Sequence, residues 1–121
     1  MVPVLKYGDT LVATIVAALS DEDLEQLRAE VIDKVGRFRA RGVIIDVTAL
    51  DVLDSFATRT IRGIASTAQL RGADTVVVGI QPDVAVAMVQ LGLTLDDIET
   101  ALDMEDGMAL LEARRRSRRV G

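Results

Sequence analysis

Two short, almost uninterrupted runs of apolar residues constrain the fold of this chain more than any other feature. They occupy residues 43–47 and 75–78 and consist mostly of Val and Ile. Runs of this length without polar alternation are typical of strands that are buried on both faces, as in a parallel sheet. The chain is therefore expected to form an α/β domain in which helices pack on a central sheet.

The remaining elements are predicted from periodicity and from helix start and stop signals. Apolar runs at residues 2–6 and 11–16 flank Gly8-Asp9, a pair that favours a hairpin turn. Apolar residues then recur at helical spacing from an expected N-cap at Ser20 to Phe38, and Gly42 is expected to close that stretch. Further helices are predicted from Ser55 to Arg71, from Pro82 to about Gly92 and from Met104 to Arg114, with a short strand at residues 98–102. This order predicts a single mixed sheet with an N-terminal antiparallel hairpin.

Composition excludes several classes of function. The 121 residues suit one domain and include no Cys and no His. The chain therefore lacks thiolate chemistry, the commonest metal ligand, and the usual base partner of a catalytic serine. No apolar run has the length of a membrane span, so a cytoplasmic protein without membrane contact is expected.

Charge is unevenly distributed along the chain. The net charge is −5, yet residues 114–119 hold five Arg and no acid. The rest of the chain is acidic, so the domain is not expected to bind nucleic acid. The sequence predicts a domain over residues 1–113 and an arginine-rich tail over residues 114–121, whose end is solvated and frayed.

In open α/β sheets, functional sites lie beyond the carboxyl ends of the strands. Residues 46–55 and 79–82 follow two predicted strands and are therefore the candidate site. Ser55 has two compatible interpretations there, as the N-cap of a helix or as a phosphorylation site. Asp46, Asp51 and Asp54 are close in sequence and would repel a phosphate, whereas the positive end of the helix dipole would attract it. Asp46 is predicted to order its loop by accepting hydrogen bonds from loop amides.

Catalytic and metal-binding alternatives find little support in these residues. Ser55 has no His near it, no Gly-x-Ser-x-Gly motif around it, and only Lys6 and Lys34 as lysines in the chain. Asp46 ends a central strand, as in a phospho-aspartate receiver, but the acidic pair and late lysine of that class are missing. No enzyme activity, cofactor or metal is therefore expected.

Several segments together carry a family resemblance. Residues 45–48 and 53–56 resemble the phosphorylation loop of STAS-domain proteins. The tracts 79–82, 84–86 and 97–103 narrow the resemblance to the RsbS and RsbR proteins of the bacterial stressosome. The likeness covers about residues 3–112 in consistent order, and the length of the chain favours the RsbS type, because RsbR-like proteins carry an additional N-terminal domain.

The resemblance implies a scaffold that is switched by phosphorylation. Proteins of this family assemble with RsbR-like partners and sequester an RsbT-like serine kinase, which phosphorylates the scaffold serine, while an RsbX-like phosphatase resets it. Ser55 occupies the matching position. A homodimer and a large hetero-oligomer are expected. The implied partner-binding surface comprises the acids near Ser55 and the start of the following helix: Asp46, Asp51, Asp54, Phe56, Thr58, Arg59 and Arg62.

Three departures from the family pattern and two alternatives remain open from the sequence, and the first departure is the arginine-rich end, which looks like an extension beyond the family core. Arg59 and Arg62 could alter kinase specificity, and Phe56 and Ala57 stand where classical anti-sigma antagonists tend to have Gly. One alternative is a stand-alone anti-anti-sigma factor that binds an anti-sigma kinase. The other is the phospho-aspartate receiver, which would be labelled at Asp46.

Overall fold

The computed structural model describes residues 2–95 and 98–120 and centres on a five-stranded sheet whose spatial order follows the chain. An antiparallel hairpin joins the first two strands, and the others are added in parallel. Gly8 makes the hairpin turn at a φ of 60°, which an L side chain rarely adopts. The strands are β1 (Val4–Tyr7), β2 (Thr10–Thr14), β3 (Gly42–Asp46), β4 (Asp74–Val78) and β5 (Glu99–Ala101).

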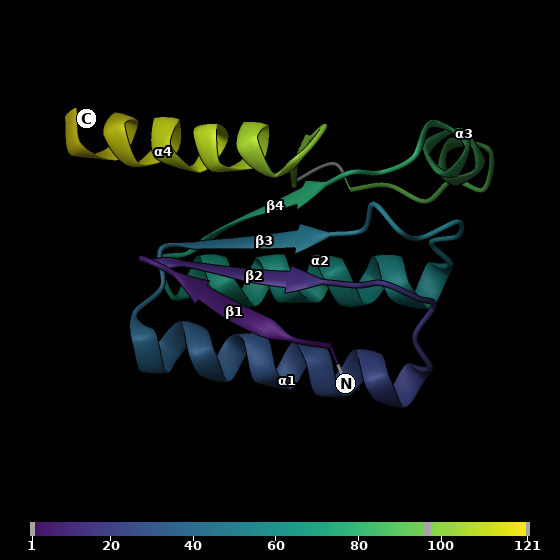
Figure 1. Cartoon of the computed structure of the whole chain (residues 1–121), viewed down its shortest axis with the longest axis horizontal. Coiled ribbons are helices and arrows are strands. Elements are labelled where there is room, and N and C mark those ends of the chain that lie inside the picture. Colours follow the sequence, from purple (N-terminus) through teal and green to yellow (C-terminus); the bar gives the residue numbers. More distant parts are fainter. Residues whose placement is uncertain (1, 96–97, 121) are drawn as a thin grey trace.

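Helices cover both faces of this sheet, as Figure 1 shows. The two crossovers β2–α1–β3 and β3–α2–β4 progress in the same direction, so their helices lie side by side on one face. The last helix packs on the other face, and the third lies beyond the carboxyl ends of the strands. The helices are α1 (Asp21–Phe38), α2 (Ser55–Leu70), α3 (Pro82–Gln90) and α4 (Met104–Val120). The predicted α/β order with a mixed sheet is confirmed.

The two central strands are buried on both faces, as their composition predicts. Val43 and Ile45 of β3 face the main core beneath α1 and α2, whereas Ile44 between them faces the smaller cluster beneath α4. All three side chains are fully buried. This alternation follows from the two-residue period of a strand, and it explains why the run lacks polar positions.

Local start signals operate as expected in α1, but its end differs from the prediction. Ser20 caps the helix by accepting a hydrogen bond from the Asp23 amide at 3.1 Å. The helix ends at Phe38, and Arg39 adopts the left-handed conformation with a φ of 51°. Gly42 therefore does not close the helix. It begins β3, where a Cβ would come within 2.8 Å of Leu111 on α4.

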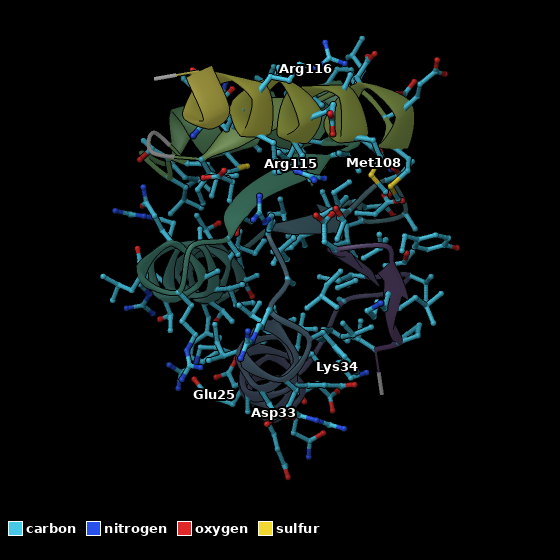
Figure 2. The ribbon with its side chains drawn as sticks, turned by 90° about the vertical axis from the view of Figure 1, so that its left-hand side faces the viewer. Glu25, Asp33, Lys34, Met108, Arg115 and Arg116 are labelled. Carbon is cyan, nitrogen blue, oxygen red and sulfur yellow. The ribbon has the colours of Figure 1, made fainter. Side chains whose placement is uncertain are left out.

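The arginine-rich end does not separate from the domain at residue 114. The helix predicted to end at Arg114 continues as α4 to Val120. Arg114 donates to Glu99 at 2.7 Å, and this hydrogen bond raises the pKa of Arg114. Arg115 pairs with Asp9 at 3.0 Å from the side of α4 that faces the sheet (Figure 2). The expectation of a solvated tail is therefore wrong for Arg114 and Arg115, because acids distant in sequence lie opposite them.

No helix within residues 2–95 and 98–120 combines the length and the hydropathy of a membrane-crossing segment.

Candidate functional site

The two loops singled out from the sequence are packed together at the carboxyl ends of β3 and β4. Gly79 adopts a φ of 80°, and a Cβ there would overlap the Thr48 side chain and lie 3.0 Å from the Thr48 Cα. Gln81 donates from its side-chain amide to the Thr48 carbonyl oxygen at 2.8 Å. The loop after β4 therefore supports the loop that leads to Ser55.

Asp46 orders its loop, as predicted. One of its carboxylate oxygens accepts hydrogen bonds from the Thr48 amide at 2.9 Å and from the Thr48 hydroxyl at 2.6 Å. This turn holds Thr48 where it can contact both Gly79 and Gln81. The described part of the chain contains no group of three or more His, Cys, Asp or Glu that could hold a metal.

The helix cap is Asp54 rather than Ser55. Asp54 has an extended backbone, with φ −79° and ψ 179°, and its carboxylate accepts a hydrogen bond from the Ala57 amide at 2.8 Å. A cap needs such non-helical geometry, whereas Ser55 is already the first residue of α2. Ser55 is exposed, and its hydroxyl forms no hydrogen bond within the described part of the chain. The hydroxyl is thus accessible from solvent.

The predicted contact residues in and before α2 fall into an exposed group and a buried one. Asp51, Arg59 and Arg62 are exposed, and the Arg59 guanidinium lies 5.9 Å from the ring centroid of the half-buried Phe56. Thr58 is only 2% exposed. Its hydroxyl donates to the Asp54 carbonyl oxygen at 2.8 Å. Thr58 therefore lies inside the domain rather than on the predicted partner surface, because it occupies the face of α2 that packs on the sheet.

An apolar groove beside Ser55 was not predicted from the sequence. Its volume is about 430 Å³, and it lies between the Ser55 loop and α3. Val52 on the loop and Leu91 after α3 are 66% and 72% exposed at its rim. Val86 and Val89 of α3 are also exposed, whereas Val84 and Met88 form the buried stripe. From α3, Val84 and Ala87 line the groove, whereas Val86 and Val89 do not, so the apolar periodicity of this helix carried no signal for the groove.

This fold and loop arrangement define the class of protein. The STAS domain model matches residues 2–107, and the chain belongs to the STAS domain family. Within it, the chain is similar to a solved RsbS variant from Moorella thermoacetica in which a serine is replaced by glutamate. Sequence identity is 34%, the TM-score is 0.82, and the match covers 95% of this chain and 97% of that one.

Other comparisons agree with this assignment. A chain of a solved stressosome is 33% identical with a TM-score of 0.74, covering 94% of this chain and 99% of that one. The RsbT co-antagonist protein RsbRA of Bacillus subtilis is 25% identical over 89% of this chain. The chain spans only 39% of the length of that curated relative. The anti-sigma factor antagonist SpoIIAA, at 18% identity and a TM-score of 0.67 over 98% of each chain, shares the fold.

Proposed function

We propose that this chain is a cytoplasmic, non-enzymatic scaffold and binding module of a stressosome-type assembly, switched by phosphorylation of Ser55. Its assembly partners are RsbR-like STAS proteins, its kinase is RsbT-like, and an RsbX-like phosphatase removes the phosphate. The observation that carries the proposal is the exposed Ser55 hydroxyl, which is free of a capping role and borders an apolar groove. The similarity to RsbS and to a stressosome chain supports the choice of assembly.

The charges around Ser55 explain how a phosphate would act as a switch. A phosphate adds about −1.5 to −2 charge at neutral pH. The N-terminus of α2 and Arg59, one turn further along the helix, attract that charge, while Asp51 and Asp54 repel it. These opposing effects leave the fold little changed. The added charge beside the groove then alters which partner the surface accepts.

The absence of an activating base for Ser55 supports a non-enzymatic role. The chain contains no His, and no carboxylate bonds to the Ser55 hydroxyl within the described residues. Asp54, the nearest acid in sequence, is engaged with the Ala57 amide. Ser55 therefore accepts a phosphoryl group from another protein in this proposal and does not attack a substrate of its own.

Assembly is tested by co-expressing the chain with an RsbR-like STAS protein and measuring particle mass by size-exclusion chromatography with light scattering. A particle on the order of megadaltons, compared with 13.0 kDa for the chain alone, is the expected result. A one-to-one complex with an anti-sigma kinase, and no large particle, would instead favour the stand-alone anti-anti-sigma alternative.

Kinase binding through the groove predicts that Leu91→Asp weakens retention of the RsbT-like kinase at least tenfold. An aspartate at the groove would be desolvated without a partner when the kinase covers it. Leu70→Asp is the matched control, because Leu70 is 87% exposed and lies at the opposite end of α2 from Ser55. Biolayer interferometry with immobilised kinase measures both. Equal affinity of the two variants would remove the groove from the interface.

A further inference from the structure

A second cavity lies at the other end of the sheet from Ser55. Its volume is about 690 Å³, within the range of roughly 300–1,000 Å³ that is usual for small-molecule sites. It is bounded by the last turn of α1, the residues that follow α2, and α4, which come together at the left-hand end of Figure 1. The 16 residues of α2 separate it from Ser55 by roughly 24 Å.

Four arginines from separate parts of the chain line this cavity: Arg39, Arg41, Arg71 and Arg115. Arg115 is paired with Asp9 at 3.0 Å and with Glu112 at 3.6 Å, and its buried Nε has no hydrogen-bond partner. Within the described residues, the other three guanidinium groups form no ion pair and no side-chain hydrogen bond. Asp9 and Glu112 are the carboxylates paired with Arg115, and neither of them lines the cavity. The cavity therefore holds uncompensated positive charge in a chain whose net charge is −5.

Two backbone features shape the cavity around these side chains. Gly36 lies within α1, where glycine costs about 1 kcal/mol relative to alanine. A Cβ at that position would lie 2.5 Å from Nη1 of Arg71, so the glycine makes room for the guanidinium. Arg39 is the one non-glycine residue with positive φ in the described part of the chain, at a position where helices usually place glycine. Gly36 thus stands at a position where local helix propensity favours alanine, and Arg39 stands at a position where backbone conformation favours glycine.

Helix capping accounts for only part of this arrangement. Cations are favoured at helix C-termini, which explains arginine at positions 39 and 71. Arg41 belongs to neither helix, and Arg115 reaches the cavity from α4, on the side that faces the sheet in Figure 2. Four guanidinium groups that line one cavity form an arrangement typical of an anion-binding site. Planar guanidinium groups bind phosphoryl oxygens in pairs of parallel hydrogen bonds.

We propose that this arginine cavity binds a small molecule carrying two or more phosphoryl groups. Three unpaired guanidinium groups match about three negative charges, which a diphosphate supplies and a monovalent anion does not. The site is independent of Ser55 and of the proposed kinase interaction. It would make the scaffold responsive to a phosphorylated metabolite as well as to its kinase.

The test is a titration of the full chain with inorganic pyrophosphate at constant ionic strength, followed by calorimetry. The wild-type chain is expected to bind saturably, and Arg39→Gln combined with Arg71→Gln is expected to weaken binding at least tenfold. Arg59→Gln combined with Arg62→Gln removes the same charge from two other exposed arginines and should change affinity less than twofold. Absence of saturable binding, equal binding of sulfate, or equal loss in both double variants would overturn the proposal.

A second variant separates binding from folding. Gly36→Ala improves helix propensity but places a methyl group against the Arg71 guanidinium. Its thermal unfolding temperature without ligand is expected to match or exceed that of wild type, while the increase caused by pyrophosphate is at least halved. The same pyrophosphate-induced increase in the variant and in wild type would contradict the assignment of the site to this cavity.

Discussion

The Ser55→Ala variant is expected to take up no phosphate from ATP and Mg²⁺ in the presence of the RsbT-like kinase, whereas the wild-type chain is phosphorylated at Ser55. The wild-type serine is available to the kinase because its hydroxyl is exposed and has no hydrogen-bond partner within the described residues. Alanine has no hydroxyl that could accept the phosphoryl group. Mass spectrometry of the proteolysed chain locates the phosphate. Equal incorporation in the alanine variant, or phosphate on another residue, would contradict the proposed switch.

Stability measurements separate this role of Ser55 from helix capping. Ser55→Ala should change the free energy of unfolding by less than about 0.5 kcal/mol, since the residue is exposed and does not cap the helix. Asp54→Ala should lower it by about 1 kcal/mol through loss of the hydrogen bond to the Ala57 amide. Urea unfolding provides both values. A larger loss for Ser55→Ala than for Asp54→Ala would restore the serine as the structural cap.

A charge at position 55 should also reduce kinase binding. Ser55→Asp adds a negative charge beside Asp51 and Asp54 at the edge of the groove. We expect weaker kinase retention than with Ser55→Ala in the same interferometry assay. If the aspartate and alanine variants bound the kinase equally well, added charge would not be the means by which the partner is released.

Gly79→Ala is expected to lower the free energy of unfolding by about 2–4 kcal/mol. The substitution introduces a side chain at a φ of 80° and forces it into Thr48, whose Cβ and Cα would lie 2.9 and 3.0 Å away. Thr48 is itself held by Asp46, so the strain reaches the loop that carries Ser55.

Gly72→Ala is the matched control for the backbone contribution. Gly72 has a φ of 86°, but no atom beyond its chain neighbours lies within 4 Å of the position that a Cβ would occupy. Its substitution should cost about 1–2 kcal/mol from conformation alone. The difference between the two variants in urea unfolding measures the contact with Thr48. Equal costs at both positions would show that the two loops are not packed together in solution.

The existence and order of the predicted strands and helices were confirmed because their signals are local, although the ends of α1 and α4 differ from the prediction. Continuous burial of β3, the cap at Ser20 and the position of Pro82 at the start of α3 depend on spacing within a few residues. Even so, local signals fail when neighbouring residues compete for one role. Asp54 and Ser55 both suit a helix start, and backbone geometry decided that Asp54 caps the helix.

The sequence by itself determined the order of the elements, the burial of the central strands and the loop in which Ser55 lies. Only the tertiary structure decided that Thr58 is buried, that α3 borders the Ser55 groove, and that Arg114 and Arg115 are tied to the domain. Only the tertiary structure likewise brought Arg39, Arg71 and Arg115 to one cavity. The physical reason is the separation along the chain of the residues involved. Hydrophobic periodicity and capping depend on residues a few positions apart. Grooves, cavities and ion pairs depend on side chains far apart in sequence that the crossovers of the sheet bring together.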